Sequence, residues 1–422
     1  MQIESIRLRN FKTFKKLEIT NIPKLCVIVG ANGVGKSTLF DVFGFLKDCL
    51  TYNVKSAVQK RGGFREMLSR GLAESEEKTI EIEIKFRLEI SGYERLVTYL
   101  LKLNEYKNKK VYIDRELLRY KRGSYGSPYH FLDFSKGEGT AIINEDDFSV
   151  IEEDLERETQ NLDSDDVLAI KGLGQFSKFK AASAFRQLIE NWHVSDFHIE
   201  AARGSKDVAG YDEHLSVSGD NLQLVAKNIA ENHPDIFNDI IKAMKHRVPG
   251  IADITPISTP DGRLLLGFQD GSFSDPFIDR YVSDGTLKMF AYLVQLHDPA
   301  PHPVLCIEEP ENQLYPTLLE ELAEEFRDYT NRGGQVFVST HSPDFLNAIN
   351  IEEVYWLKKD NGYTTAKRAL EDSLIASYME SGDKMGYLWK QGLFSGAAPD
   401  SKEVIIKATP KKTKKSIKAK RY

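Results

Sequence analysis

The sequence predicts an α/β protein: a mixed sheet with flanking helices, an antiparallel β subdomain, and a mostly helical insertion. Three observations predict this class. A β-rich apolar run at 24–29 leads through a glycine-rich turn into a helical apolar pattern over 36–50. Residues 79–90 alternate strictly between apolar and polar side chains, as in a strand with one buried face. Beyond residue 250, strand and helix patterns alternate along the chain, which is typical of an α/β sheet.

The composition fits a folded protein. Hydrophobic residues make up 41% and charged residues 28% of the 422, and these shares argue against a disordered, collagenous or coiled-coil chain. The three cysteines have no C-x-x-C spacing, so neither a disulfide framework nor a cysteine zinc site is predicted. No apolar stretch approaches the roughly 20 residues that span a bilayer, and the N-terminus lacks the apolar core of a signal peptide. We therefore expect a protein of the reducing cytoplasm with no membrane partner.

Four regions are expected along the chain. Residues 1–100 form the N-terminal half of the α/β body, and residues 250–395 form its C-terminal half. Between them, residues 101–249 form a β-arm and then the mostly helical insertion, with the irregular helical pattern beginning near residue 125. Residues 396–422 form a basic tail that we expect to be disordered.

The tail differs from the body in charge. Residues 407–422 hold eight Lys or Arg and no acid, whereas residues 1–406 carry a net charge of −14. Such a basic run can neutralise phosphates on nucleic acid or dock on an acidic partner. It can equally be a solvated chain end, so nucleic acid remains an open alternative as a partner.

The strongest motif is Gly30-Ala31-Asn32-Gly33-Val34-Gly35-Lys36-Ser37, which matches G-x-x-x-x-G-K-[ST] between a predicted strand and a predicted helix. Backbone N–H groups of such a loop wrap phosphates, and glycines permit the close approach that this requires. Lys36 then reaches the β- and γ-phosphates, and Ser37 supplies a hydroxyl to Mg²⁺. The motif predicts a nucleoside triphosphate site whose loop residues are Gly30, Asn32, Gly33, Gly35, Lys36, Ser37 and Thr38.

A second motif follows an apolar strand, where residues 303–307 lead into Glu308 and Glu309. In open α/β sheets, ligands bind at the carboxyl ends of the strands. Glu308 can hold Mg²⁺, and Glu309 can polarise the water that attacks the γ-phosphate. Two glutamates after a strand could also begin a surface loop, but a phosphate-binding loop in the same chain favours the catalytic interpretation.

Two shorter motifs also suit a phosphate site. His341 directly follows an apolar strand, and its imidazole can contact the γ-phosphate or orient the attacking water. A hydrolase triad of Ser339, His341 and Asp344 is disfavoured because no G-x-S-x-G elbow is present. The run from Ser283 to Gly285 opens a predicted helix whose N-terminus suits an anion, although ordinary capping explains it as well when it is taken alone.

Taken in order, these four motifs resemble those of ABC-type ATPases of the SMC/RecF class, specifically stand-alone AAA-family ATPases related to the ATPase half of OLD nucleases. The run Ile6–Phe14 looks like the opening strand of that class. The resemblance covers about residues 1–100 and 250–370, and it implies an ABC-type P-loop ATPase head with an insertion between its half-sites. By resemblance, Gly30–Thr38 is the Walker A motif, Ser283–Thr286 a degenerate ABC signature, Val304–Glu309 the Walker B motif with catalytic Glu309, and His341 the switch histidine.

The resemblance also implies partners and an activity. Such ATPases sandwich two ATP molecules between head-to-tail subunits, which implies a homodimer or a larger even assembly. Lys36 of one chain would face Ser283 and Gly285 of the other across one γ-phosphate. The expected activity is slow, Mg²⁺-dependent hydrolysis of ATP to ADP and phosphate, acting as a switch. Related architectures occur in bacterial anti-phage defence, so the working hypothesis is control of a separate effector, a nuclease or toxin.

Other functions are weighed against this one. A RecF-like DNA-binding ATPase of repair or recombination is the main alternative, with the tail or a basic groove holding the duplex. A transporter motor is disfavoured by the degenerate signature and the large insertion. Residues 100–250 lack sustained heptads, which argues against an SMC rod. OLD-type relatives carry a Toprim nuclease after the ATPase, but Asp372, Glu380 and Asp383 fit a helix and its exit loop better than a nuclease site.

The remaining candidates concern single residues. Gln59 is the candidate for the Q-loop that the resemblance implies. His193, His198 and His214 raise the alternative of a metal site, but the strand-like segment 194–200 brings no ligand set together. These histidines are therefore expected to be solvated or to pack in the core.

Overall fold

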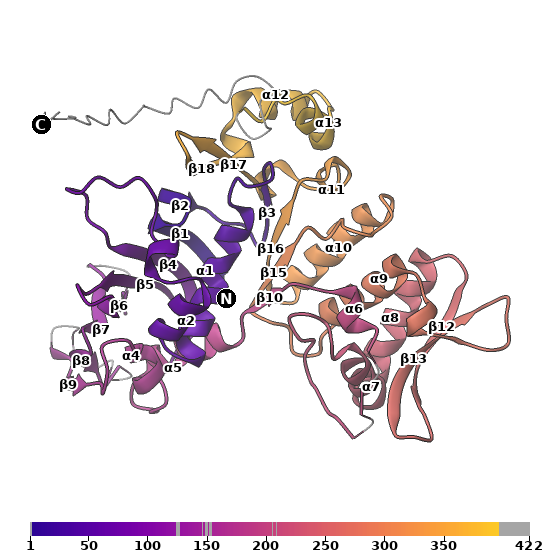
Figure 1. Cartoon of the computed structure of the whole chain (residues 1–422), viewed down its shortest axis with the longest axis horizontal. Helices are drawn as coiled ribbons and strands as arrows, with labels where there is room; N and C mark the ends of the chain where they lie inside the picture. The colour runs from indigo at the N-terminus through magenta and orange to yellow at the C-terminus, as the bar shows by residue number, and fades with distance from the viewer. Residues whose placement is uncertain are drawn as a thin grey trace, which may run out of the picture.

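Two large β-sheets organise the chain, and a smaller third sheet lies on the far side of the second (Figure 1). The computed structural model describes residues 2–123, 127–145, 147, 151, 154–204, 206–207 and 209–395. The predicted basic tail, 396–422, lies outside the described residues. The mixed α/β fold with an antiparallel subdomain confirms the predicted fold class.

The first sheet is antiparallel and has eight strands in the order β2-β1-β4-β5-β6-β7-β8-β9. Alternating apolar side chains of these strands pack on the helices α1, α2, α4 and α5 in one hydrophobic core. The strands are β1 Gln2–Phe11, β2 Phe14–Thr20, β4 Ile80–Ile90, β5 Tyr93–Glu105, β6 Val111–Tyr120, β7 Tyr129–Ser135, β8 Glu138–Ile142 and β9 Arg157–Asn161. The helices are α1 Lys36–Thr51, α2 Val54–Lys60, α3 Phe64–Met67, α4 Ala169–Leu173 and α5 Lys180–Glu190.

Strands β7, β8 and β9 correct the expectation of an irregular helical pattern from about residue 125. They extend the antiparallel sheet, and β9 pairs with β8 from Glu138↔Asn161 to Ile142↔Arg157. The sequence of β9, RETQN, contains no apolar residue, so hydrophobic alternation cannot reveal it. Main-chain hydrogen bonds to β8 hold this strand, and that pairing is a tertiary contact.

The second sheet has six strands in the order β10-β15-β16-β3-β17-β18, and all but β18 run parallel. Its central strands read as unbroken apolar runs because both faces are covered. In β3, Cys26 and Ile28 enter the core of the first sheet, whereas Leu25, Val27 and Val29 enter a second core under the C-terminal helices. The strands are β3 Leu25–Val29, β10 His193–Ser195, β15 Val304–Glu308, β16 Gln335–Thr340, β17 Val354–Asp360 and β18 Tyr363–Arg368.

The second core joins the parallel sheet to the C-terminal helices and the small sheet. The strands of the small sheet are β11 Lys206–Asp207, β12 Ile251–Ser258, β13 Arg263–Asp270 and β14 Phe277–Ile278. The remaining helices are α6 Ile199–Ala202, α7 Leu222–Asn232, α8 Pro234–Arg247, α9 Asp284–Leu296, α10 Leu318–Asn331, α11 Pro343–Leu346, α12 Ser373–Glu380 and α13 Met385–Lys390. Within the described ranges, no helix combines the length and apolarity needed to cross a bilayer.

One buried glutamine ties the two large sheets together. The side-chain amide of Gln335, which has no exposed surface, accepts a hydrogen bond from the backbone N–H of Ile3 at 2.7 Å. It donates to the carbonyls of Ile3 and Pro23, both at 3.0 Å. Three backbone groups near the start of the chain therefore depend on one side chain of β16.

Candidate functional site

Three of the four predicted motifs meet at the carboxyl edge of the parallel sheet. Strand β16 lies between β15 and β3, and all three run in the same direction. Their ends lead respectively into His341, Glu309 and the loop that begins at Gly30. Parallel pairing therefore brings together motifs that lie far apart in the sequence.

The glycine-rich loop forms one wall of a cavity of about 380 Å³. Gly35 adopts a φ of 110°, and a Cβ there would lie only 2.8 Å from the Thr13 hydroxyl, so both the backbone and the space require glycine. Helix α1 begins at the next residue, with its N-terminus at the cavity. The cavity is lined by Thr13, Asn32, Gly33, Gly35, Lys36, Ser37, Thr38 and Glu309.

The Lys36 side chain lies folded over its own loop. Its Nζ donates to the carbonyl of Gly30 at 2.9 Å and lies 3.8 Å from Oε1 of Glu309. Only 6% of the residue is exposed, and this burial lowers the pKa of Lys36 despite the carboxylates around it. A buried ammonium held by carbonyl oxygens is poised to bind an anion that enters the cavity.

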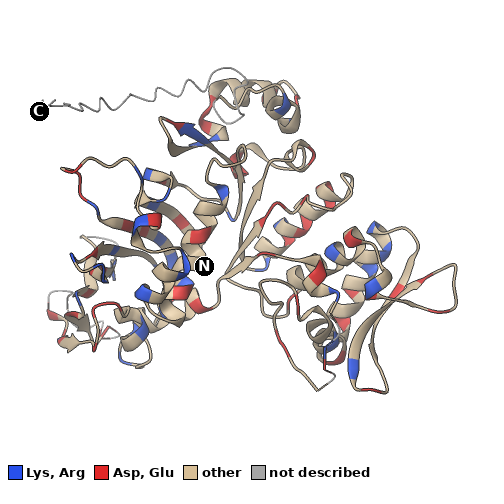
Figure 2. Cartoon of the chain, viewed as in Figure 1, with Lys and Arg blue, Asp and Glu red and all other residues tan. Residues whose placement is uncertain are grey.

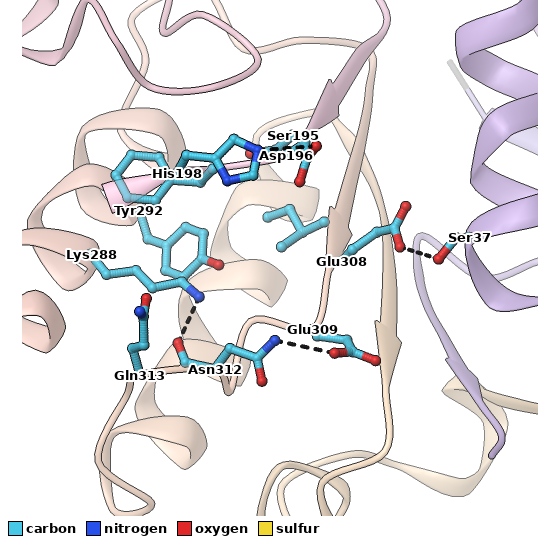
Figure 3. A pocket seen from close by; sticks show the side chains of 12 residues that line it. Ser37, Ser195, Asp196, His198, Lys288, Tyr292, Glu308, Glu309, Asn312 and Gln313 are labelled. Atoms are coloured by element: carbon cyan, nitrogen blue, oxygen red, sulfur yellow. Dashed lines mark hydrogen bonds and ion pairs between the residues drawn. The ribbon is translucent and has the colours of Figure 1, made fainter. Parts of the chain in front are cut away.

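The two glutamates after β15 face different partners (Figure 3). The Ser37 hydroxyl donates to Oε2 of Glu308, and burial raises the pKa of Glu308. Glu309 accepts a hydrogen bond from the Asn312 amide at 3.1 Å. Burial acts to raise the pKa of Glu309, but the Asn312 bond and the charges of His341 and Lys36 lower it overall. One carboxylate thus lies against the serine hydroxyl, while the other stays ionised beside the lysine.

Glu309 has an unusual backbone conformation. Its φ of 44° lies in the left-handed region, where a non-glycine residue is uncommon, and its N–H donates to the Ser339 carbonyl at 2.9 Å. This turn directs the carboxylate toward the loop instead of along the strand. A strained backbone that aims a charged side chain into a cavity is typical of a functional site.

His341 completes the group from the neighbouring strand. Its Nδ1 lies 3.2 Å from Oε1 of Glu309 and 3.4 Å from Oε1 of Glu311. The Thr340 hydroxyl and the His341 backbone N–H both bond to Glu311, at 2.8 and 3.1 Å. Glu311 therefore fixes the turn that presents the histidine.

Ser283 and Gly285 lie in a different place. They line a separate cavity of about 720 Å³. Among the residues that the structure describes, neither Ser283 nor Gly285 lines the cavity around Lys36. The Ser283 hydroxyl caps α9 by accepting from the Thr286 N–H at 3.2 Å, while Arg203 bonds to the carbonyls just before the helix. A Cβ on Gly285 would lie 2.8 Å from the Gln313 carbonyl, so this position requires glycine.

Comparison with protein families matches residues 25–347 to the family described as "AAA domain, putative AbiEii toxin, Type IV TA system". The chain belongs to this AAA-domain family. The matched region contains the glycine-rich loop, the signature residues, both glutamates and His341.

Individual relatives are similar to this AAA-domain chain and belong to the SMC/RecF class that the motifs resemble. It is 26% identical over 152 residues to the DNA replication and repair protein RecF of Lactococcus lactis subsp. cremoris (strain MG1363), covering 34% of this chain and 40% of that protein. It is 29% identical over 87 residues to RecF of Paenarthrobacter aurescens (strain TC1), covering 20% of this chain and 22% of that protein. The matched segments span well under two thirds of both relatives.

Solved structures support the fold. An SMC head bound to the C-winged helix domain of ScpA superposes with a TM-score of 0.52 and 14% identity, covering 87% of this chain and 97% of that chain. An SMC head with an extended coiled coil, bound to the C-terminal domain of ScpA derived from Pyrococcus furiosus, gives a TM-score of 0.50 and 14% identity, covering 90% and 98%. At this identity the similarity shows a common fold, an ABC-type ATPase head.

Some residues of this site were given no role from the sequence. Glu311, Asn312 and Lys288 contact the predicted residues or lie next to them, and Lys288 Nζ donates to the Asn312 carbonyl at 2.6 Å. Burial lowers the pKa of Lys288 to about 8. The dense run of polar residues after β15 could have indicated Glu311 and Asn312. Lys288 instead lies within the apolar pattern of a helix, which gives no such indication. The Q-loop candidate Gln59 is exposed on α2 and does not line the cavity around Lys36.

Proposed function

We propose that this protein is a Mg²⁺-dependent ATP-binding and ATP-hydrolysing switch. One observation carries the proposal: the contacts that join Ser37 to Glu308, Lys36 to Glu309, and Glu309 to His341 at the carboxyl edge of the parallel sheet. A phosphate-binding lysine, oxygen ligands for Mg²⁺ and an ionised carboxylate are the groups that phosphoryl transfer to water requires.

Each side chain has a proposed task. Lys36 and the amides of the loop bind the β- and γ-phosphates, and Ser37 and Glu308 would hold Mg²⁺, which neutralises phosphate charge when bound. The oxygen donors of Ser37 and Glu308 already touch, which fits a hard cation. Glu309 orients the attacking water and accepts its proton at a carboxylate oxygen, and His341 holds that carboxylate and the γ-phosphate in position.

We infer that two chains associate head to tail around ATP. The separate location of Ser283 and Gly285 supports this, because these signature residues serve no nucleotide in their own chain's cavity. The N-terminus of α9 and the Ser283 hydroxyl would instead face the γ-phosphate held by the other chain. ATP then joins the two chains, and its hydrolysis loosens them.

The output of the switch is control of a separate effector protein, a nuclease or toxin, in bacterial anti-phage defence. The family description, which names a toxin of a toxin–antitoxin system, supports a defence setting. One related head structure is bound to the C-winged helix domain of ScpA, which supports the idea that such a head engages another protein.

A complementation experiment tests the dimer and the ATPase together. Lys36→Ala removes the lysine that contacts the phosphates, so chains with this change should not bind ATP. Ser283→Arg blocks the signature but leaves the glycine-rich loop intact. Each variant alone should be inactive, whereas a mixture forms dimers with one intact composite site and should regain part of the ATPase rate. The matched control is Glu324→Gln, a charge change at an exposed position of α10. Full activity of Ser283→Arg alone would contradict the dimer, and activity of Lys36→Ala would contradict the ATP site.

A RecF-like role in DNA repair or recombination is the second candidate, favoured by the RecF matches. It predicts DNA binding that depends on ATP and weakens steeply with salt. Figure 2 shows Lys and Arg interspersed with Asp and Glu along the ribbon of the described chain. Filter binding at low salt, with and without ATP, separates the two candidates.

A further inference from the structure

A group of histidines and one aspartate lies at the opposite end of the parallel sheet from the nucleotide motifs. His302 comes two residues before β15, Asp298 comes two residues after α9, and His214 lies in the segment between β11 and α7. One ligand atom from each of these three side chains lies within 4.8 Å of the other two. Three separate segments therefore present metal-ligating atoms to one point.

Hydrogen bonds to the protein hold these side chains in place. Nδ1 of His302 lies 3.1 Å from the carbonyl oxygen of Asn191. Because a carbonyl can only accept, Nδ1 must be the protonated nitrogen, and Nε2 keeps a free lone pair. One oxygen of Asp298 accepts from the Ala300 N–H at 2.9 Å, and the other lies 2.6 Å from Nδ1 of His214. Such bonds orient the ligands of metal sites and fix their tautomers.

A third histidine, beside the group, has an unused nitrogen. The His193 ring stacks on the His302 ring, with centroids 4.8 Å apart and planes inclined by 21°. His193 is only 4% exposed, and its Nε2 is buried with no hydrogen-bond partner among the residues that the structure describes. A buried polar nitrogen without a partner is uncommon in a native fold, and a bound ligand would supply one.

We propose that His214, Asp298 and His302 bind a divalent transition-metal ion, with Zn²⁺ as the best match, and that His193 or a water molecule completes a tetrahedral set. Two imidazoles and one carboxylate are a common zinc ligand set, whereas Mg²⁺ and Ca²⁺ prefer oxygen ligands throughout. Ligand atoms around tetrahedral zinc lie about 3.3 Å apart, so the side chains need only a small inward movement.

The surroundings set the expected strength of binding. Asp298 and His302 are largely buried, which shields the site from water, but the charges of Lys47 and Arg332 lie close enough to repel a cation. We therefore expect weaker binding than at a site of four thiolates. The metal would join the turn between α9 and β15 to the segment before α7. That turn connects the helix that begins after Ser283 to the strand that ends at Glu308.

Metal binding to the full-length, tag-free chain tests the proposal. After treatment with a chelator and without nucleotide, the protein should take up about one Zn²⁺ per chain, measured by competition with a chromophoric chelator. Co²⁺ in place of Zn²⁺ should give the visible absorption bands of a tetrahedral site, and zinc should raise the melting temperature. His214→Ala and Asp298→Asn should abolish all three effects, whereas the control His198→Ala, at an exposed histidine directly before α6, should keep them.

Two results would overturn the proposal. The first is a wild-type chain that shows no zinc uptake and no change in melting temperature. The second is uptake that His214→Ala and Asp298→Asn leave unchanged, which would place the metal elsewhere. Circular dichroism of each variant establishes that loss of binding is not loss of folding, and Asp298→Asn keeps the volume of the side chain so that at least one variant retains the native packing.

Discussion

Replacing Glu309 by glutamine should separate ATP binding from ATP hydrolysis. The change keeps the size of the side chain but removes its charge and its ability to accept a proton. Nζ of Lys36 lies 3.8 Å from the Glu309 carboxylate, so a phosphate bound by Lys36 would lie about 5 Å from a like charge. At an effective dielectric constant of about 20, that repulsion is about 3 kcal/mol.

Solvent and Mg²⁺ reduce this figure, since the Glu309 side chain is 29% exposed. We therefore expect the Glu309→Gln chain to bind ATP about 5- to 30-fold more tightly, which corresponds to about 1–2 kcal/mol. Hydrolysis should slow by about 10²- to 10⁴-fold, the usual contribution of a positioned base. ATP should also hold the variant as a dimer for longer, because the nucleotide at the interface persists.

Three measurements check these expectations: equilibrium binding of a fluorescent ATP analogue with Mg²⁺, single-turnover hydrolysis of ATP, and the mass distribution with and without nucleotide. Glu324→Gln on α10 is the control for a simple change of net charge. Hydrolysis by Glu309→Gln at close to the wild-type rate would refute the role of Glu309. ATP affinity that falls instead of rising would refute the electrostatic reasoning.

Three further predictions concern the signature and the stability of the fold. Gly285→Ala should prevent ATP-dependent dimerisation but leave ATP binding intact, because its Cβ would meet the Gln313 carbonyl at 2.8 Å; light scattering and nucleotide titration measure the two effects. Gln335→Leu removes the partner of three backbone groups, two of them buried, and should lower the free energy of unfolding by about 2–4 kcal/mol in urea titrations, whereas Gln175→Leu at an exposed site should change it little. Burial raises the pKa of Glu116 from 4.5 to about 7, so the folded chain keeps a proton that the unfolded chain releases. As the pH rises from about 4.5 to 7, this group should lower the free energy of unfolding by about 3 kcal/mol, and Glu116→Gln should remove that part of the pH dependence.

The residues of the candidate site could be predicted from the sequence wherever a motif is formed by consecutive residues. The glycine-rich loop needs only a strand, a turn and a helix in succession, and those follow from apolar periodicity and from the glycines. The glutamates after β15 and the histidine after β16 were readable for the same reason, since a strand end is a local feature. The fold class followed from the alternation of such elements.

Other features depended on which segments pair in space. Strand β9 carries no apolar residue and exists through its hydrogen bonds to β8. Glu311 became part of the site only because β16 brings Thr340 and His341 to it. The group of three histidines and one aspartate needed His214 and His302 to meet, whereas the sequence raised His193, His198 and His214 only as a disfavoured metal site.

The sequence by itself determined the local structures that carry phosphate chemistry, because backbone geometry and side-chain periodicity act over a few residues. Only the tertiary structure decided that Ser37 touches Glu308 across 271 positions, that the signature lies in its own cavity, and that distant histidines converge. Those outcomes depend on strand order and on the burial of both faces of the parallel sheet. Such packing is a property of the whole chain, and no short stretch of residues encodes it.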